Sequence, residues 1–217
     1  MILSAAQITA LAPHFRKPEG EIGKEVGRQM AKHNEEAVAF TIKCLEVQPA
    51  DHILEIGFGP GEGIAQSVQL TPNGYVAGID ISDVMLEMAK ERNHRAMMQE
   101  HVELTLGEAR SMPYEDESFH KLFAVNVFHF WKDPAIELAE CFRVLRPGGK
   151  VAFFMSYPSS WRPGIKESGL FIAREPAQVE AELTKAGFVR PHSKSITLVR
   201  SEEEGEYRGF VTTGEKQ

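Results

Sequence analysis

Length, composition and charge exclude several classes of protein at the outset. The chain has 217 residues, 42% of them hydrophobic and 25% charged, which favours a globular domain over a disordered or fibrous chain. Its net charge of -7 disfavours a general affinity for nucleic-acid phosphates. No stretch approaches the roughly eighteen apolar residues of a membrane span, and the N-terminus lacks the basic start of a secretory signal. We therefore expect one domain with no membrane span, located in the cytoplasm.

Metal and disulfide chemistry have little support in the sequence. Cys44 and Cys141 are the two cysteines, far apart and outside any CxxC pattern. The run His33-Asn34-Glu35-Glu36 lacks the two-histidine helical spacing of a zinc protease. We expect both cysteines to be buried and no metal to be bound.

The first fifty residues differ from the rest because they contain no strand pattern. Apolar residues at helical spacing predict a helix over 22–46, with Pro49 marking its end. We expect residues 1–50 to form an N-terminal helical cap or lid, and residues 51–217 to form the main unit of a single structural domain. Gly20, Gly23 and Gly27 are expected to make the cap flexible, with Arg28, Met30 and His33 as candidate lid contacts, although a purely structural helix explains the pattern equally well.

From residue 51 onward, strand and helix patterns alternate. Strands are predicted at 52–56, 75–79, 101–106, 121–125 and 151–155, and helices at 61–70, 83–92, from Pro134 to the Pro147-Gly148-Gly149 stop, and at 176–186. The runs 188–199, broken by Pro191, and 207–212 flank an acidic turn at 201–206, with residues 202–204 solvated, and predict an antiparallel hairpin. The pattern indicates a doubly wound α/β fold: a mostly parallel seven-stranded sheet with helices on both faces and a C-terminal antiparallel hairpin.

The loop after the first predicted strand carries the main functional signal. Gly57, Gly59 and Gly61 stand at alternate positions behind Glu55, and glycines there let the backbone turn tightly and approach a ligand. Asp80 ends the second predicted strand, where an acidic residue reaches ribose hydroxyls in nucleotide-binding sheets. The two features together indicate a nucleotide-like ligand at the carboxyl edge of the sheet.

Other nucleotide sites fit this loop less well. A dinucleotide fingerprint needs a third glycine or alanine, where counting from Gly57 and Gly59 gives Glu62 and Ile64, and no P-loop sequence occurs. A pyrophosphate would be repelled by Glu55, whereas the ammonium and sulfonium of S-adenosylmethionine tolerate a nearby carboxylate. Charge therefore favours the methyl donor over a nicotinamide dinucleotide.

Three ordered segments resemble the class I S-adenosylmethionine-dependent methyltransferases, particularly their ubiquinone-biosynthesis-like small-molecule group. The segments are LEIGFGPG at 54–61, GIDIS at 78–82 and LRPGGK at 145–150, and the resemblance covers roughly residues 45–190. It implies S-adenosylmethionine as cofactor, with S-adenosylhomocysteine as product. The residues that it implies for the cofactor site are Glu55, Gly57, Gly59 and Gly61 of the loop, Asp80 at the ribose, Ile81 and Met85 at the adenine, Glu108 and Ala109 after the third strand, and Asn126 after the fourth.

Glu108 departs from the family pattern, and the loop after Asn126 differs from that of another group of methyltransferases. Glu108 stands where the family usually has Asp, so it is either an adenine contact or a solvated loop charge. The loop that follows Asn126 does not have the Asn/Asp-Pro-Pro-Tyr sequence of methyltransferases that act on nucleic-acid amino groups. This difference favours a small-molecule acceptor.

The aromatic segment after Asn126 is the expected acceptor region. Among the eight histidines, His129 is the best placed to take a proton from a hydroxyl acceptor, with packing or substrate contact as the alternatives. Phe128, Trp131 and Tyr157 are candidate substrate contacts, although such aromatics are as often core residues. The acceptor atom and the oligomeric state are left open.

Three functions are consistent with these patterns to different degrees. The first is methyl transfer to a small molecule, and the second is a S-adenosylmethionine-binding module without catalysis. The third, a nicotinamide-dependent oxidoreductase, is disfavoured by the glycine spacing.

Overall fold

A computed structural model describes residues 3–201 and 205–217, without the side chains of residues 200 and 201. The helices are α1 (Ala5–Arg16), α2 (Gly20–Leu45), α3 (Glu62–Leu70), α4 (Asp83–Met98), α5 (Ala135–Val144) and α6 (Pro176–Lys185), with short 3-10 turns η1 (Phe128–Phe130) and η2 (Pro158–Ser160). The strands are β1 (His52–Ile56), β2 (Tyr75–Asp80), β3 (Val102–Leu106), β4 (Phe119–Val125), β5 (Leu145–Ser156), β6 (Val189–Ser201) and β7 (Gly205–Glu215). The acidic run predicted at 202–204 lies outside the described residues.

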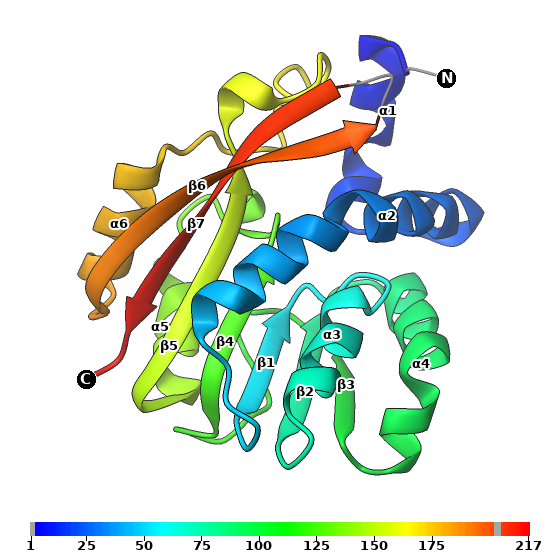
Figure 1. Cartoon of the computed structure of the whole chain (residues 1–217). Helices are drawn as coiled ribbons and strands as arrows, with labels where there is room; N and C mark the ends of the chain where they lie inside the picture. Colours follow the sequence, from blue (N-terminus) through cyan, green and yellow to red (C-terminus); the bar gives the residue numbers. More distant parts are fainter. Residues whose placement is uncertain (1–2, 202–204) are drawn as a thin grey trace.

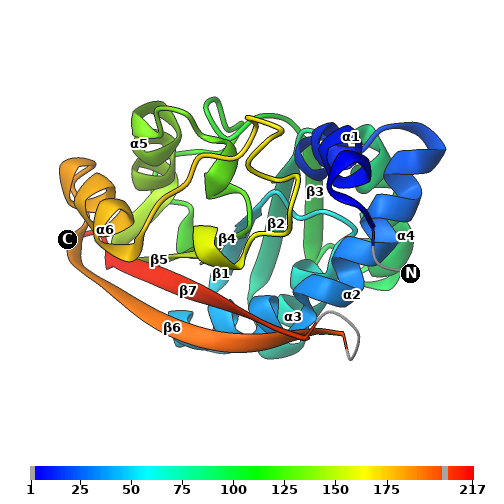
Figure 2. The ribbon, with the colours of Figure 1, turned by 90° about the horizontal axis from the view of Figure 1, so that it is seen from above.

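The strands form a mixed sheet in the order β3-β2-β1-β4-β5-β7-β6, seven strands in the described part of the chain. Strands β1 to β5 are parallel, while β7 is antiparallel to both β5 and β6 (Figure 1). Helices α5 and α6 lie on one face of the sheet, and α2 and α3 lie on the other (Figure 2). The predicted mixed α/β sheet with a C-terminal hairpin is confirmed.

Alternating residues of the central strands bury both faces of the sheet. On one face, Leu54 and Leu122 pack with residues of α5 and α6, and on the other, Ile53 and Phe123 pack with residues of α2. All four side chains are fully buried. A strand buried on both faces reads as a nearly continuous apolar run, which is why the sequence placed β1 at its observed bounds.

Several element ends differ from their predictions for local reasons. Helix α1 was not predicted, although Ser4 and Gln7 form a capping box at its start. Helix α5 ends at Val144, and the Pro147-Gly148-Gly149 segment belongs to β5 instead of stopping the helix. Its backbone pairs with the C-terminus, since the Gly148 N–H donates to the Lys216 carbonyl (2.7 Å).

The terminal hairpin is longer than predicted, and its bulge is explained by proline. The pairing of β6 with β7 shifts register between Val189 and His192, around Pro191, which has no N–H to donate to the ladder. The predicted break is thus a bulge within one strand.

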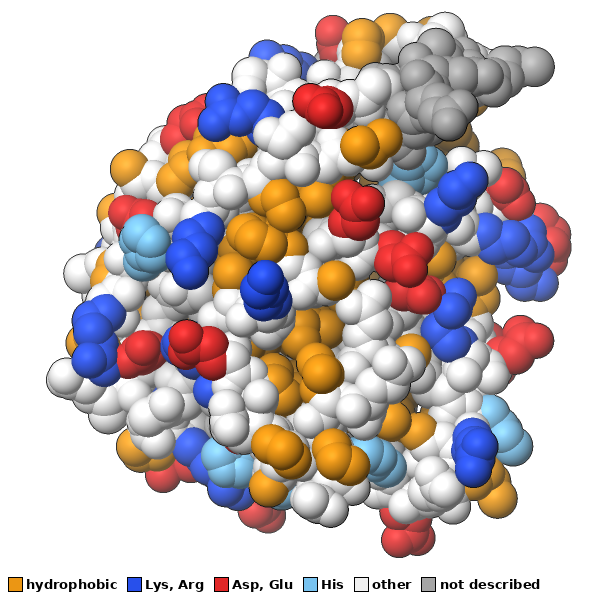
Figure 3. Space-filling view, in the orientation of Figure 1, with side chains coloured by type: hydrophobic (Ala, Val, Ile, Leu, Met, Phe, Trp, Pro, Cys, Tyr) orange, Lys and Arg blue, Asp and Glu red, His pale blue; other side chains and the backbone are white. Residues whose placement is uncertain are grey.

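The surface carries charges of both signs. Lys and Arg side chains are interspersed with Asp and Glu on the face in Figure 3, and hydrophobic side chains are visible between α2 and the hairpin. Partly buried Phe40, Cys44 and Ile196 pack against the core there. Within the described ranges, no helix combines the length and apolarity needed to cross a membrane.

Candidate functional site

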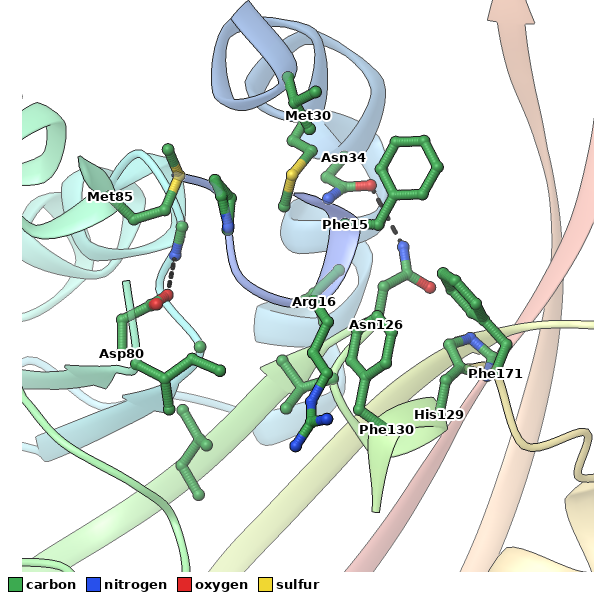
Figure 4. A pocket seen from close by; sticks show the side chains of 18 of the residues that line it. Phe15, Arg16, Met30, Asn34, Asp80, Met85, Asn126, His129, Phe130 and Phe171 are labelled. Carbon is green, nitrogen blue, oxygen red and sulfur yellow. Dashed lines mark hydrogen bonds between the residues drawn. The ribbon is translucent and has the colours of Figure 1, made fainter. Parts of the chain in front are cut away.

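A cavity of about 1150 Å³ opens at the carboxyl ends of the parallel strands, beneath α1 and α2. Single-ligand pockets usually measure roughly 300–1,000 Å³, so this cavity has room for more than one small molecule. Figure 4 shows Asp80 and Met85 on one side, Asn126, His129, Phe130 and Phe171 on the other, and Arg16 between them. We call these sides the glycine-loop half (Gly57, Gly59, Asp80, Ile81, Met85, Gly107, Glu108, Ala109) and the aromatic half (Phe15, His129, Phe130, Trp161, Phe171); all of these residues line the cavity.

The glycine loop turns sharply between β1 and α3. Gly57, Gly59 and Gly61 have φ angles of 68°, 51° and 85°, which side chains rarely tolerate. A Cβ atom at Gly57 would lie 2.4 Å from the Val127 Cγ2 atom, whereas one at Gly59 would meet only the Met30 methyl at 4.0 Å. Gly57 and Gly59 line the cavity, so the backbone at Gly59 faces open space where a ligand can approach.

Gly61 and Glu55 support the loop from behind and do not line the cavity. The Gly61 carbonyl accepts a hydrogen bond from Asn93 Nδ2 (3.1 Å) at the start of α3. Glu55 is buried against Gly63, and burial, together with the nearby Asp80 charge, raises the pKa of its carboxyl well above the usual value. The structure thus places these two predicted site residues beneath the loop.

Asp80 ends β2 and joins the loop to the cavity. Its Oδ2 accepts a hydrogen bond from the Gly59 N–H (2.8 Å), and its Oδ1 accepts one from the Ser82 N–H (2.9 Å). Burial raises the pKa of Asp80 to about 6, and the backbone hydrogen bonds oppose that rise. The carboxylate is therefore held in place by the loop while it lines the cavity.

The other predicted cofactor residues also lie on the wall: Ile81, Met85, Glu108, Ala109 and Asn126. Asn126 follows β4 with a φ of 57°, and its Nδ2 donates to Asn34 Oδ1 of α2 (3.2 Å). Its own Oδ1 is buried without a hydrogen-bond partner among the described residues. A strained backbone and an unsatisfied oxygen at one residue are typical of a ligand-binding position.

His129 is the most deeply buried polar group of the aromatic half. Its side chain is 1% exposed, and neither ring nitrogen has a hydrogen-bond partner within the described part of the chain. Burial lowers the pKa of His129 to about 3, and the nearby Ile172 backbone opposes this fall. The imidazole is therefore neutral near pH 7.

The three predicted substrate contacts are separated by the fold. Trp131 lines the cavity, but Phe128 is fully buried in the core, where its ring lies 5.2 Å from that of Phe153. Tyr157 does not line the cavity: its ring lies 4.9 Å from that of Phe210, and its hydroxyl bonds with Ser195 Oγ (2.8 Å). Phe128 and Tyr157 thus pack within the protein.

The N-terminal helices supply cavity residues that sequence reasoning missed. Phe15 and Arg16 come from the end of α1, and Phe171 comes from the loop before α6. The capping box at Ser4 was the available signal for α1, whereas no local pattern marks Phe171. Met30 and His33, predicted as lid contacts, line the cavity, and Arg28 does not.

Two glycines of α2 lie in close contact with neighbouring residues. A Cβ atom at Gly23 would lie 2.7 Å from the Pro18 carbonyl carbon, and one at Gly27 would lie 2.5 Å from the Met85 methyl. Ser82 Oγ also donates to the Pro18 carbonyl (2.6 Å). The α1–α2 connection is therefore attached directly to the loop after β2.

Comparisons with known proteins identify the family of the chain. A family model described as a methyltransferase domain matches residues 54–153. The chain is 33% identical over 129 residues to the uncharacterized methyltransferase YdaC of Bacillus subtilis, covering 59% of this chain and 69% of that protein. The chain therefore belongs to the methyltransferase family. The methyl donor of class I methyltransferases is S-adenosylmethionine.

Two further matches show how far the similarity extends. The demethylmenaquinone methyltransferase of Symbiobacterium thermophilum is 32% identical over 123 residues, covering 56% of this chain and 47% of that protein, so the chain spans about half the length of this relative. The structure of Haemonchus contortus phosphoethanolamine N-methyltransferase 2 in complex with S-adenosyl-L-methionine covers 98% of this chain and 57% of that chain, with a TM-score of 0.68 and 18% identity. At that identity, the match establishes the shared fold.

Proposed function

We propose that the protein transfers the methyl group of S-adenosylmethionine to a small-molecule acceptor. The observation that carries the proposal is the hydrogen bond from the Gly59 N–H to Asp80. This bond holds a carboxylate, which can bind ribose hydroxyls, next to a glycine backbone that a ligand can approach. In this proposal, Asp80 binds the ribose, Ile81 and Met85 contact the adenine with Glu108 and Ala109, and the Gly57–Gly59 backbone lies under the methionine part. Glu55 and Gly61 act indirectly by holding the loop.

The size of the cavity supports transfer to a second molecule rather than binding of the donor alone. The aromatic half lies beside Asn126, across from Asp80 (Figure 4). Holding donor and acceptor in near-attack geometry supplies much of the acceleration in a displacement at an activated sulfonium. The bound sulfonium supplies the reactive methyl group, and the chain positions the two partners and excludes water.

The cofactor is tested by isothermal titration with S-adenosylhomocysteine, NAD and NADP. We expect one molecule of S-adenosylhomocysteine to bind per chain and neither dinucleotide to compete with it. Preferential binding of a dinucleotide would contradict the proposal. Incubation with metabolite extracts and methyl-labelled donor, followed by mass spectrometry, then tests catalysis: a labelled small molecule is expected, and donor binding without any labelled product would indicate a binding module.

We further propose that residues 1–50 act as a lid over both halves. Helices α1 and α2 contribute Phe15, Met30 and His33 to the cavity wall, so a ligand inside would contact them. Closure of such a segment excludes water from the sulfonium. Hydrogen exchange of residues 14–34 should slow when S-adenosylhomocysteine is added, and equal exchange in both states would contradict ligand-linked closure.

A further inference from the structure

His129 offers hydrogen-bonding capacity that the described protein does not use. A neutral imidazole carries one N–H donor and one acceptor nitrogen, and neither is paired. Burying such groups without partners is costly, so a buried pair on a cavity wall indicates a ligand that satisfies it. The complementary ligand group both donates and accepts a hydrogen bond.

The surroundings of His129 are aromatic. Its ring centroid lies 5.5 Å from that of Trp161 and 5.8 Å from that of Phe171, and Phe171 in turn lies 4.8 Å from Phe130 and 6.4 Å from Phe15. The Trp161 indole N–H is already bonded to Ser156 Oγ (3.2 Å). The aromatic half therefore offers apolar walls, with His129 as the polar group between them.

The charged side chain that acts on the imidazole is bound to other parts of the protein. Arg174 is the charged residue that acts on the ring, and its guanidinium donates to the Trp131 carbonyl (2.7 Å) and pairs with Glu182 (3.0 Å). The guanidinium also lies over the Phe128 ring. Its donors are thus occupied by the protein.

The other charged residues of the wall are exposed or have protein partners. The exposed ones are Arg16, Glu25, Glu108, Lys132 and Asp133. Glu137 lies 3.8 Å from Arg110, and Arg162, which follows Trp161, is half-buried and interacts with the protein. An acceptor can extend a charged group toward these residues. The portion that contacts His129 has to be uncharged, because a charge in such an apolar compartment would be unsolvated.

We propose that the acceptor presents a hydroxyl group on an apolar portion of the molecule, and that His129 binds this hydroxyl and takes its proton. The inference rests on the proposed function and adds the acceptor atom, oxygen. The hydroxyl oxygen attacks the methyl carbon, the carbon–sulfur bond breaks with its electron pair remaining on sulfur, and the hydroxyl proton passes to the imidazole. The products are a methyl ether, S-adenosylhomocysteine and an imidazolium that later releases its proton to water.

The charge balance helps a neutral imidazole to accept the proton, although burial opposes its protonation. Burial holds the pKa of His129 low while the site is empty of ligand. During transfer the sulfonium loses its positive charge as the imidazole gains one, so the compartment never holds two cations. A protonated amine would instead place a second cation beside the sulfonium, which disfavours nitrogen acceptors of that kind.

The test uses simple aromatic probes on the full chain saturated with S-adenosylhomocysteine. Ligand-observed NMR titrations compare 2-naphthol with naphthalene and with 2-naphthylmethylammonium. We expect 2-naphthol to bind about tenfold more tightly than either, the size of effect that one hydrogen bond to a buried group provides. Equal or weaker binding of 2-naphthol would overturn the inference.

Variants connect this preference to His129. His129→Phe keeps an aromatic ring and should remove the preference for 2-naphthol over naphthalene, while His129→Gln, which still donates and accepts, should retain part of it. The control is His94→Phe, because His94 is exposed on α4 and does not line the cavity. Retention of the full preference in His129→Phe, or its loss in His94→Phe, would contradict the assignment.

The outcome is separable from that of the proposed function. Failure of the wild-type chain to bind S-adenosylhomocysteine removes the cofactor assignment itself. Binding of S-adenosylhomocysteine without any preference for the hydroxyl probe removes only the oxygen acceptor.

Discussion

The two halves of the cavity satisfy their polar groups in opposite ways. In the glycine-loop half, each oxygen of the Asp80 carboxylate already accepts one hydrogen bond from a backbone N–H. In the aromatic half, both nitrogens of His129 are buried and unpaired within the described residues, as is the Oδ1 atom of the neighbouring Asn126. The first half is pre-organised by its own backbone, whereas the second depends on a ligand to complete it.

This difference fits the separate tasks of a transferase. A donor shared by a whole family can be bound by backbone geometry that a short motif encodes. An acceptor is recognised by side chains brought together from distant segments, here α1, the loop after β4 and the loop before α6. Changes to the two halves should therefore have separable effects.

The largest effect is expected from Asp80→Ala. It removes the carboxylate from the loop and from the ribose hydroxyls, and should weaken S-adenosylhomocysteine binding by about 1–3 kcal/mol, or roughly 5- to 150-fold. Calorimetry measures the affinity, and the unfolding midpoint in urea checks the fold. A dissociation constant equal to that of the wild type would remove the ribose assignment.

The second-largest effect is expected from a pH titration of S-adenosylhomocysteine binding to the glycine-loop half. Because the pKa of Asp80 is raised to about 6, the carboxylate is mostly ionised at pH 7.5 and about one-tenth ionised at pH 5. Ribose hydroxyls donate to the ionised form, so affinity for S-adenosylhomocysteine should fall by up to about tenfold over this range. Asp80→Asn provides the control, and its affinity should change little with pH.

Asp80 should also affect the stability of the fold, and this contribution should increase as the pH falls, whereas the affinity for S-adenosylhomocysteine should decrease. A folded-state pKa above the unfolded value means that Asp80 stabilises the fold below pH 3.8, and that this contribution is lost as the pH rises through 6. The lowered pKa of His129 acts the other way, because its contribution is lost as pH falls below 6.5. The difference in unfolding free energy between wild type and Asp80→Asn isolates the carboxyl, and it should grow as pH falls from 7 to 5. A constant difference would contradict the raised pKa.

A smaller effect is expected from Gly23→Ala in α2, which lies over the cavity. The new Cβ atom would meet the Pro18 backbone at 2.7 Å, so α2 and the α1–α2 connection must move apart. Overpacking costs about 1–3 kcal/mol and the helix propensity of alanine returns about 1 kcal/mol, which leaves a loss of about 1 kcal/mol. Urea unfolding measures it, with exposed Lys24→Ala as control; a stabilised Gly23→Ala variant would argue against close packing.

The smallest effect is expected from Tyr157→Phe. Its hydroxyl bonds with Ser195 away from the cavity, so removing it should change the unfolding free energy by less than about 1 kcal/mol and leave ligand affinities within about twofold. A clear loss of affinity for S-adenosylhomocysteine or 2-naphthol in calorimetric titrations would return Tyr157 to the acceptor site.

The glycine-loop half was readable from sequence because its signal is local. Gly57, Gly59 and Asp80 stand at fixed places relative to strand ends, and strand ends are predictable from apolar runs such as 52–56. Glu55 and Gly61 share the motif but lie behind the loop, since the motif encodes the support of the turn as well as its exposed surface. A motif does not distinguish those two tasks.

The aromatic half was predicted only in part because its members meet through tertiary packing. His129 and Trp131 line the cavity, whereas Phe128, which precedes His129, faces the core, since neighbours in a 3-10 turn point in different directions. Phe15 and Phe171 are brought to the cavity by α1 and by the loop before α6, and no spacing in the sequence connects them. The sequence likewise did not predict that β5 includes Pro147-Gly148-Gly149, because the partner of this segment is the distant C-terminus.

The measurement that tests this division most directly is a calorimetric titration of S-adenosylhomocysteine into wild type, Asp80→Ala and His129→Phe. The account predicts one site in the wild type, a loss of roughly fivefold or more in Asp80→Ala, and an affinity within about twofold of wild type in His129→Phe. Equal losses in the two variants, or no binding by the wild type, would contradict it.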